Sequence, residues 1–376
     1  MSFNSNDARF MARAIQLARQ GWYTTRSNPR VGCVLVKTID NDLQIIGEGW
    51  HEKPGLAHAE VNAIKAAETN GHDTNGVTAY VTLEPCSHFG KTPPCAKGLI
   101  DAGVTRVVCA MTDPNPQVAG RGFEMLRAAG IRVEFGLMEQ DAKALNLGFI
   151  KRMTTGLPRV VAKTAVSVDG RTAMASGESQ WITGSASRTE VQRLRAQSGA
   201  VITGSGTVLY DNPSMNVREE SLVESVHFEQ PLRVIIDSKH QVQAQAKIFQ
   251  SDGHCWLVSA SDRADIFSNA QDKSVSLHQV KQNSTGFADL ESVLKELADA
   301  GINDVLIEAG SELLGAFMQQ NLVDELHVFM APKLLGSVAR PMANLPFDSM
   351  KQAIELELTD VRQIGKDLKL TYNRVD

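Results

Sequence analysis

The chain has 376 residues, of which 43% are hydrophobic and 22% charged, and its formal net charge is −5. This length suggests two domains, and the ordinary composition excludes a mainly disordered or fibrous protein. Residues 1–150 carry 15 basic and 15 acidic side chains, so the negative balance lies in residues 151–376. Neither half is a basic module, which favours a small-molecule substrate over a nucleic acid or an anionic membrane.

Targeting signals and disulfides are not expected. Residues 1–7 lack the charged and apolar regions of a secretory signal, and no stretch approaches the ~18 apolar residues of a membrane span. The five cysteines are too few and too scattered for a disulfide framework. These features predict a cytoplasmic enzyme with reduced thiols.

The first part of the chain alternates between helical and strand patterns. Helices are expected over 7–20, 59–68, 96–102 and 122–129, and strands over 31–36, 77–83, 106–110 and 131–135. Helices between strands imply crossover connections and a mostly parallel sheet covered on both faces. The periodicity fades over 145–158, and we place the boundary there, between domains 1–150 and 151–376.

The second part repeats the α/β pattern. Strands are expected over 159–166, 200–203, 234–237, 256–259, 304–308 and 325–330, and helices over 187–197, 289–300 and 311–320. Ser187 and Glu190 have the spacing of a capping box, in which Ser187 would begin its helix. Signals over 218–285 are weak. Both halves are therefore predicted to be α/β.

The densest chemical signal is His58, two residues before Glu60, followed by Cys86 and Cys95. One imidazole and two thiolates suit a tetrahedral Zn²⁺ with its fourth position open, as in catalytic sites. Such an ion lowers the pKa of bound water from ~15.7 towards 7. Glu60, at a predicted helix start, would move protons for that water. Pro85 would occupy the first turn of a helix whose dipole favours the Cys86 thiolate.

Each of these signals has an ordinary alternative. A lone His-x-Glu carries almost no information. Cys86 and Cys95 could be buried small hydrophobic residues, as Cys33, Cys109 and Cys255 are expected to be in their apolar strands. Cys95, however, lies in a polar segment of lysine and proline, where a structural cysteine has little to pack against. The combination favours a metal site.

These motifs resemble the zinc-dependent cytidine and deoxycytidylate deaminase superfamily, whose signature is His-x-Glu and then Pro-Cys-x-x-Cys. Here eight residues separate Cys86 from Cys95, where the general signature has two. With this longer loop the chain resembles the bifunctional pyrimidine deaminase–reductases of riboflavin biosynthesis. Four further segments carry the resemblance: Asn28–Gly32, Gly49–His51, Asp113–Pro116 and Val118–Gly122. It covers essentially the whole chain.

The resemblance implies that residues 1–150 form a cytidine-deaminase-like three-layer α/β/α domain. This domain would hold one Zn²⁺ and remove the 2-amino group of a diaminopyrimidinone that carries a phosphoribosylamino group, with Glu60 moving protons. Lys91 is a candidate contact for the substrate phosphate, with a solvated loop charge as the alternative. Asn28 and His51 are expected on the opposite wall of the site.

The second half lacks a full Gly-x-Gly-x-x-Gly, because Leu209 stands at the third glycine position after Gly204 and Gly206. A Rossmann domain is therefore not supported. A strand runs into Gly310, where Ser311 is expected to cap a helix whose free N–H groups would hold a phosphate. The alternative is an ordinary turn between strand and helix. The second half resembles the family's reductase domain, whose fold is similar to dihydrofolate reductase and which reduces the ribosyl to a ribityl chain with NADPH.

The matched motifs imply site residues for this reductase. Those implied to line NADPH are Ala165, Trp181, Thr207, Asp211, Ser238, Gly310, Ser311, Glu312, Leu313, Leu314, Gly315 and Ala316. Those implied to face the substrate are Ser179, Arg195, Met215, Arg218 and Glu308. Arg195 and Arg218 suit a phosphate, although Arg195 could be a solvated helix charge. Trp181 could equally be core. Lys163 and Asp211 are candidates for polarising the open-chain sugar or relaying its proton.

Two other functions would share the zinc site. A nucleic-acid-editing deaminase with an appended non-catalytic domain needs a basic, aromatic-lined surface, and the balanced charge of residues 1–150 disfavours it. A non-enzymatic zinc-binding or ligand-binding protein would have no use for Glu60. We therefore expect a bifunctional, homo-oligomeric enzyme that acts on a pyrimidine ribotide and binds neither nucleic acid nor membrane.

Overall fold

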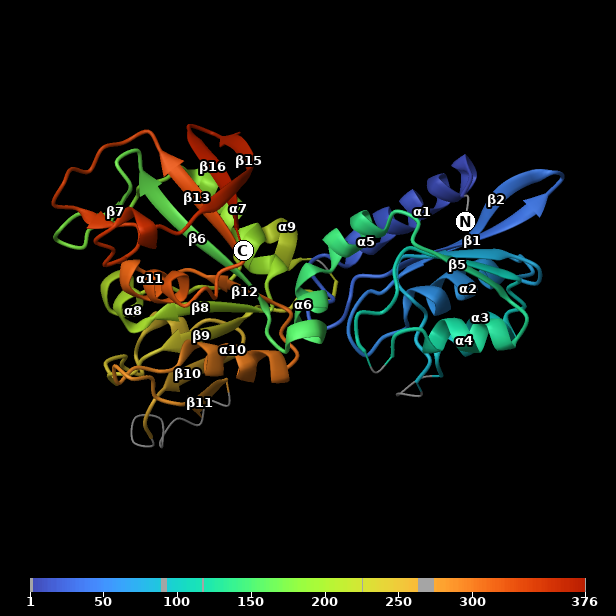
Figure 1. The fold of residues 1–376 in the computed structure, drawn as a ribbon, viewed down its shortest axis with the longest axis horizontal. Helices are drawn as coiled ribbons and strands as arrows, with labels where there is room; N and C mark the ends of the chain where they lie inside the picture. The colour runs from blue at the N-terminus through green and yellow to red at the C-terminus, as the bar shows by residue number, and fades with distance from the viewer. Residues whose placement is uncertain (1–2, 89–92, 117, 225, 263–273, 376) are drawn as a thin grey trace. The chain divides into compact units, whose positions relative to one another are not determined.

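The computed structural model describes residues 3–88, 93–116, 118–224, 226–262 and 274–375. The chain divides into two units, residues 1–156 and 157–376 (Figure 1). Each unit has its own sheet and its own buried core. No helix of the described segments is long and apolar enough to span a bilayer.

The first unit contains one five-stranded sheet, in the order β2-β1-β3-β4-β5. Its strands are β1 (Gly32–Ile39), β2 (Asp42–Trp50), β3 (Thr78–Val81), β4 (Arg106–Cys109) and β5 (Arg132–Phe135). Its helices are α1 (Ser5–Ala18), η1 (Arg19–Gly21), α2 (Ala59–Thr69), α3 (Cys95–Asp101), α4 (Arg121–Ala128), α5 (Glu139–Leu145) and α6 (Leu147–Thr155).

Helices cover both faces of this sheet. Helices α1 and α5 lie on one face and α2, α3 and α4 on the other (Figure 1). Successive residues of β1 point to opposite faces, so Val34 packs with α1 and Leu35 with α2 and α3. This three-layer α/β/α arrangement confirms the predicted fold of the first half. Cys33 and Cys109 are fully buried in strands of this sheet, as expected.

The expectation of a mostly parallel sheet holds only for β3, β4 and β5. Strand β1 is antiparallel to both β2 and β3. The β1–β2 hairpin turns at Asp40 and Asn41, which both have positive φ angles of 51° and 68°. Two such residues between strands are typical of a tight hairpin, so the adjacent Asp and Asn were a local signal for this turn that the strand prediction did not use.

The second unit is built on a nine-stranded sheet, in the order β11-β10-β9-β8-β12-β6-β13-β16-β15. Its strands are β6 (Arg159–Ser167), β8 (Ala200–Gly204), β9 (Leu232–Ile236), β10 (Cys255–Ser259), β11 (Val275–Gln279), β12 (Asp304–Ile307), β13 (Glu325–Ala331), β15 (Leu356–Ile364) and β16 (Asp367–Arg374). Its helices are α7 (Ser185–Gln197), α8 (Ser205–Asp211), α9 (Glu220–Val223), η2 (Lys247–Phe249), α10 (Leu290–Asp299), α11 (Ser311–Gln319) and η3 (Met350–Gln352). Two short strands, β7 (Arg171–Ala173) and β14 (Arg340–Pro341), pair separately.

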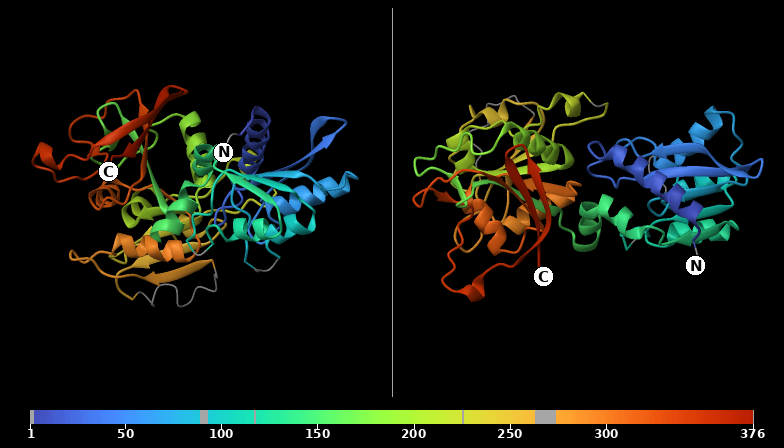
Figure 2. Two further views of the ribbon diagram at one scale, coloured as in Figure 1. Left: turned by 45° about the vertical axis from the view of Figure 1, so that its right-hand side comes forward. Right: turned by 90° about the horizontal axis from the view of Figure 1, so that it is seen from above.

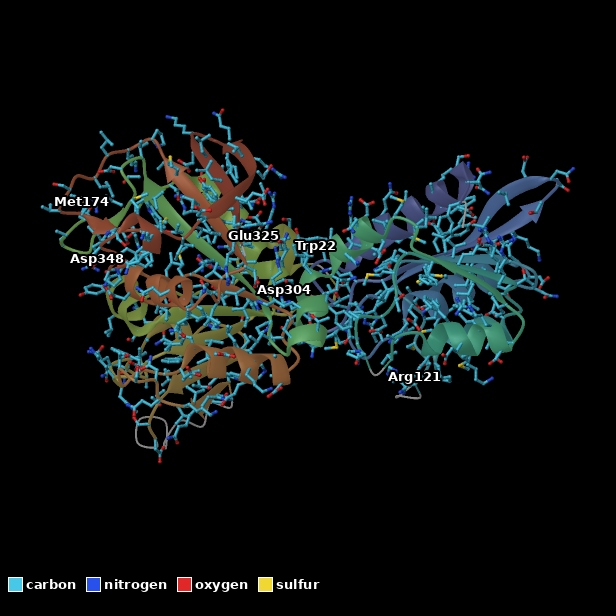
Figure 3. All side chains as sticks on the ribbon, viewed as in Figure 1. Trp22, Arg121, Met174, Asp304, Glu325 and Asp348 are labelled. Carbon is cyan, nitrogen blue, oxygen red and sulfur yellow. The ribbon has the colours of Figure 1, made fainter. Side chains whose placement is uncertain are left out.

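The parallel strands of this sheet are, in order, β11, β10, β9, β8, β12, β6 and β13. The C-terminal hairpin β15–β16 adds two antiparallel strands at the edge next to β13 (Figure 2). Helices α10 and α11 cover one face and α7 the other. Arg159 joins the starts of β6, β12 and β13, because its guanidinium lies 2.7 Å from Glu325 and 3.7 Å from Asp304. Asp304 and Glu325 are labelled in Figure 3. The carboxyl ends of these strands therefore meet at the opposite edge, where parallel sheets bind ligands.

Two local predictions were wrong. The capping box fails because α7 begins at Ser185 after Gly184, and the buried Ser187 hydroxyl donates to Asp367 of β16 at 2.6 Å. Helix α11 is capped by Gly310 and not by Ser311. Residues 145–158, where the apolar periodicity fades, contain helix α6, which ends where Gly156 takes a positive φ of 75°.

Candidate active sites

The predicted metal ligands come together in the first unit. His58 precedes α2 as its N-cap, Cys86 follows β3 in a loop, and Cys95 is the first residue of α3. Their ligand atoms all lie within 4.8 Å of one another, with His58 Nδ1 3.1 Å from Cys95 Sγ and 3.7 Å from Cys86 Sγ. A tetrahedral zinc ion needs such atoms roughly 3.6–3.8 Å apart, so this donor set fits one.

A backbone amide stabilises the Cys86 sulfur, although Pro85 does not begin a helix as predicted. Helix α3 begins instead at Cys95, whose N–H donates to Cys86 Sγ at 3.2 Å. The hydrogen bond with the Cys95 side chain is the main cause that lowers the pKa of Cys86, to about 4, and His58 adds to it. The site therefore favours the thiolate form that a metal requires.

Glu60 lies in the first turn of α2, two residues after His58, and is only 3% exposed. Burial raises the pKa of Glu60 to about 7, against the opposing effect of His58. Its carboxylate also interacts with the Cys95 thiol, which places it beside the metal ligands. A carboxyl group with a pKa near neutrality can both accept and release a proton under physiological conditions.

Asn28 and His51 form a pair that contacts the predicted metal ligand His58. Asn28 Nδ2 lies 3.0 Å from His51 Nε2, and the His51 ring contacts the His58 ring edge to face. His51 Nδ1 faces the Ala57 carbonyl at 3.2 Å, so the proton is on Nδ1 and Nε2 accepts from Asn28. Burial lowers the pKa of His51 to about 4, so this ring is neutral. Lys91 lies outside the described residues.

The second site contains a buried ion pair at the carboxyl end of β12. Arg195 of α7 binds Glu308 through two bonds, Nε to Oε1 at 2.5 Å and Nη2 to Oε2 at 2.9 Å. Lys163 Nζ of β6 lies 4.0 Å from Glu308 Oε2. Arg195 is 8% exposed, so the interpretation of it as a solvated helix charge is wrong. Burial opposes the ionised form of Glu308, but Arg195 and then Lys163 lower its pKa.

The two arginines of this cluster, Arg195 and Arg218, differ in their exposure and in their hydrogen-bond partners. Arg195 also donates to the Asn216 carbonyl at 3.0 Å and contacts Met215 Sδ at 3.6 Å. Arg218 is exposed and donates to Asn216 Oδ1 at 2.8 Å. Partial burial lowers the pKa of Arg218, and the neighbouring Arg195 lowers it further. Asn216 therefore accepts a hydrogen bond from each arginine, and it was not predicted from the sequence. The sequence feature that could have indicated it is its position between two predicted site residues, Met215 and Arg218.

Two helix N-termini meet beside this cluster. Helix α8 follows β8 and α11 follows the neighbouring strand β12, so both begin at the carboxyl edge of the sheet. A Cβ built on Gly310 would lie 3.9 Å from Thr207 Oγ1, and one on Gly204 would lie 3.3 Å from Leu313. The N-termini of the two helices thus lie close together, and such an arrangement of amides suits a dinucleotide phosphate.

Most of the remaining predicted residues of α11 have partners within the protein. Gly315 faces Asn344, since a Cβ there would lie 2.2 Å from the Asn344 carbonyl oxygen. Glu312 accepts both of its hydrogen bonds from Asn344 Nδ2. Leu314 is buried in the core, and Ala316 packs against that core. Gly310 and Ser311 lie at the N-terminus of the helix.

The other predicted cofactor and substrate residues surround the same edge. The Ser179 hydroxyl donates to Asp211 Oδ1 at 2.9 Å. Trp181 is 63% exposed and its ring lies under the Arg188 guanidinium at 4.4 Å, so a core position is excluded. Ser238 follows β9 and accepts from the Ala288 N–H at 2.9 Å. Ala165 is half-buried in β6.

Comparisons with known proteins find matches to both parts of the chain. The RibD C-terminal domain matches residues 158–370, and the cytidine and deoxycytidylate deaminase zinc-binding region matches residues 4–111. Riboflavin biosynthesis protein RibD of Haemophilus influenzae is 47% identical and covers 99% of this chain and 98% of its own. The Escherichia coli protein of the same name is 46% identical, with 97% and 98% covered.

Two solved structures resemble the whole chain. Acinetobacter baumannii RibD (form 1) has a TM-score of 0.89 at 45% identity, covering 98% of this chain and 99% of its own. A diaminohydroxyphosphoribosylaminopyrimidine deaminase/5-amino-6-(5-phosphoribosylamino)uracil reductase from Thermotoga maritima has a TM-score of 0.85 at 32% identity, with 98% and 99% covered.

Proposed function

The chain belongs to the RibD family of riboflavin-biosynthesis proteins, and from this premise we propose how its residues carry out two reactions. It is a bifunctional enzyme, with a zinc-dependent pyrimidine deaminase and an NADPH-dependent reductase. The deaminase converts 2,5-diamino-6-(5-phosphoribosylamino)pyrimidin-4(3H)-one to 5-amino-6-(5-phosphoribosylamino)uracil, and the reductase then converts the ribosyl to a ribityl side chain. We assign the first activity to residues 1–150 and the second to residues 151–376.

The deaminase proposal rests on the convergence of His58, Cys86 and Cys95 within 4.8 Å, which is the observation that carries the function. These three side chains are the proposed zinc ligands. When bound, zinc supplies a Lewis acid that activates water at neutral pH. Glu60 would take a proton from the attacking water and deliver it to the departing amino group, for which a pKa near 7 is well matched.

The substrate ring is proposed to lie between the metal ligands and the wall formed by Asn28 and His51. Neutral His51 keeps its Nε2 as an acceptor and so fixes the Asn28 amide, which has a second N–H and a carbonyl for the pyrimidine edge. Lys91, on the loop between Cys86 and Cys95, is proposed to meet the phosphate.

For the reductase, we propose that Arg218 binds the ribotide phosphate and that Arg195 holds Glu308 in position. The Arg195 guanidinium donates to Glu308 and to the Asn216 carbonyl, whereas the Arg218 guanidinium is exposed and accessible to a ligand. Ionised Glu308 is then a fixed acceptor for sugar hydroxyls, and Ser179 and Met215 complete this side.

NADPH is proposed to bind at the neighbouring N-termini of α8 and α11. When bound, NADPH supplies the hydride. Thr207, Gly310 and Ser311 are the residues placed for its phosphates, with Ala165, Trp181, Asp211 and Ser238 around them and Glu312–Ala316 supporting the helix. Lys163 is the proposed proton donor, because burial lowers its pKa and its ammonium lies beside Glu308. The alternative donor, Asp211, already accepts a hydrogen bond from Ser179.

We further propose that the enzyme acts in the cytoplasm as a homo-oligomer, on a free pyrimidine ribotide. The nearly balanced charge of the chain supports a free small-molecule substrate, and its five cysteines, none of them in a disulfide, support the cytoplasm. Measuring the mass of the native protein by light scattering tests the oligomer. A monomeric mass would remove this part of the proposal and leave the two activities unaffected.

A coupled assay tests the two activities together. The diaminopyrimidine ribotide is supplied with NADPH, and ammonia release and NADPH oxidation are recorded separately, before and after zinc is removed with a chelator. We expect chelation to abolish ammonia release, while NADPH oxidation persists when the deaminated intermediate is supplied directly. Ammonia release that survives complete zinc removal would refute the proposed site.

A further inference from the structure

Glu84 is a buried carboxylate outside the proposed catalytic machinery. It follows β3 and stands two residues before Cys86, and it is 3% exposed. Among the described residues no cationic side chain pairs with it. Its partners are backbone amides: Oε2 accepts from Asp113 at 3.1 Å and Gly120 at 3.0 Å, and Oε1 from Gly122 at 3.0 Å and Phe123 at 3.4 Å.

These amides come from a segment far from Glu84 in sequence. Asp113 follows β4, while Gly120, Gly122 and Phe123 form the N-terminus of α4, which begins at Arg121 (Figure 3). The first N–H groups of a helix lack partners within the helix, and their dipole favours a negative charge. Glu84 therefore caps α4 from outside, with both of its carboxyl oxygens accepting from backbone amides. The Glu84 N–H also donates to the Met111 carbonyl at 3.0 Å, which adds a second tie to the same segment.

Pro85, between Glu84 and Cys86, packs directly against Gly122 of α4. A Cβ built on Gly122 would lie 2.0 Å from the Pro85 carbonyl oxygen and 3.2 Å from Glu84 Oε1. Such contacts would force the backbone to move, so only glycine permits this approach. On its other side, the Cys86 carbonyl accepts from the Ala96 N–H at 3.2 Å and its Sγ from the Cys95 N–H at 3.2 Å. The ligand segment is thus fixed between α3 and α4.

We propose that Glu84 is a positioning residue for the metal site, and that its bonds to the N-terminus of α4 set where the Cys86 sulfur lies. This inference rests on the proposed zinc ligands and adds a residue that contacts none of them. Partners that orient metal ligands typically change metal affinity about 10–100-fold when they are removed.

Glu84→Gln tests the proposal, because it keeps the shape and replaces one acceptor oxygen with an NH₂ that faces amide donors. The matched control is Glu124→Gln, which removes an exposed charge from the first turn of the same helix. In the full chain, zinc affinity is measured by competition with a chromophoric chelator, and the absorption of the cobalt-substituted protein reports ligand geometry. We expect Glu84→Gln to weaken zinc binding by about 10–100-fold and to shift the sulfur-to-cobalt charge-transfer bands in the absorption spectrum. Reductase activity should be unchanged. Glu124→Gln should match the wild type.

The outcomes separate the two proposals. A wild-type chain that binds no zinc refutes the metal site itself. A folded Glu84→Gln variant with wild-type zinc affinity and cobalt spectrum refutes only the role of Glu84. If Glu84→Gln fails to fold, Gly122→Ala keeps the carboxylate but displaces the Pro85 carbonyl, and it should weaken zinc binding in the same way. Wild-type affinity in Gly122→Ala, or unfolding of the first unit in both variants, would overturn the positioning role.

Discussion

Glu60 and Glu308 are both buried, yet their surroundings give them opposite protonation behaviour. Burial raises the pKa of Glu60 to about 7, because the nearby His58 opposes this effect only in part. Burial also disfavours ionised Glu308, but the charges of Arg195 and Lys163 reverse the result and lower its pKa. The deaminase site thus contains a carboxyl group that exchanges protons, and the reductase site contains one that keeps its charge.

Replacing Glu60 with Gln tests the first role. The amide keeps the shape but cannot take a proton, so the kcat of ammonia release should fall by about 10²–10⁴. Zinc content, measured by elemental analysis, and reductase activity should stay at wild-type values. Glu68→Gln, on the exposed side of the same helix, is the control and should change neither. Ammonia release within tenfold of the wild type would exclude Glu60 as the proton carrier.

The two arginines of the reductase site should respond differently to substitution. Arg218→Ala removes an exposed guanidinium, so we expect the KM for the ribotide to rise at least tenfold (about 1.4 kcal/mol) with little change in stability. Arg195→Met leaves Glu308 buried without its main partner, which should lower the free energy of unfolding by about 3–5 kcal/mol. Steady-state kinetics and urea unfolding measure these effects. Equal loss of stability in both variants would contradict the division of roles.

At the scale of elements, the N-terminus of α7 is tied to the C-terminal hairpin. The Gly184 N–H and the Ser187 hydroxyl both donate to Asp367, at 2.8 and 2.6 Å, and Lys369 pairs with Glu190 at 2.9 Å. Polar residues that suggested a local cap therefore hold strand β16 against the helix. A side-chain pattern of this kind does not reveal whether its partner is the adjacent backbone or a strand about 180 residues away.

Ser187→Ala distinguishes these two uses. Loss of the buried hydroxyl should cost about 1 kcal/mol and expose the β15–β16 hairpin to faster hydrogen exchange, while the first turn of α7 keeps its protection. Peptide-level exchange measured by mass spectrometry reports the two segments separately. Ser185→Ala, at the exposed start of the same helix, is the control. Faster exchange at the start of α7 with an unchanged hairpin would restore the capping box.

Local signals explain which elements the sequence could predict. Helices α2, α4 and α10 and the buried parallel strands were placed to within a few residues, because apolar spacing and glycine ends are local features. Strands β2 and β15 were missed because neither shows an apolar run: the first four residues of β2 are exposed, as are six of the nine residues of β15. Their positions depend on pairing with a neighbouring strand, which local sequence reports weakly.

The candidate sites show the same division. His58, Cys86 and Cys95 could be predicted, since metal chemistry restricts residue type and the motif is compact in sequence. The pairing of Arg195 with Glu308 could not, because 113 positions separate them and only the packing of α7 on β12 brings them together. The hydrogen bonds from backbone amides to Glu84 could not be predicted for the same reason, because the donor residues are 29 to 39 positions away in the sequence.

In the molecule as a whole, each unit has an acidic side chain outside its proposed site that is held by cationic partners: Asp7, which is buried, and Glu325, which is partly buried. In the first unit, Asp7 accepts from Arg106 at 2.7 Å and Tyr80 at 2.8 Å. In the second, Glu325 binds Arg159 and His327. Burial by itself would raise both pKa values, but these hydrogen bonds and charges lower the pKa of Asp7 and that of Glu325 to about 2. Each unit therefore contains a separate acid-sensitive group.

The lowered pKa values of Asp7 and Glu325 determine how the stability of each unit depends on pH. An unfolded aspartate titrates near ~3.9, so the stabilisation from Asp7 is complete above that pH and is lost as the pH falls towards about 2. Asp7→Asn should reduce the stability of the first unit by about 2 kcal/mol at pH 7 and by much less at pH 2.5. Glu325→Gln should do the same to the second unit only. Urea unfolding, with hydrogen exchange of peptides from each unit, measures the two transitions. A deficit in Asp7→Asn that is the same at both pH values would show that its carboxylate charge contributes nothing to folding.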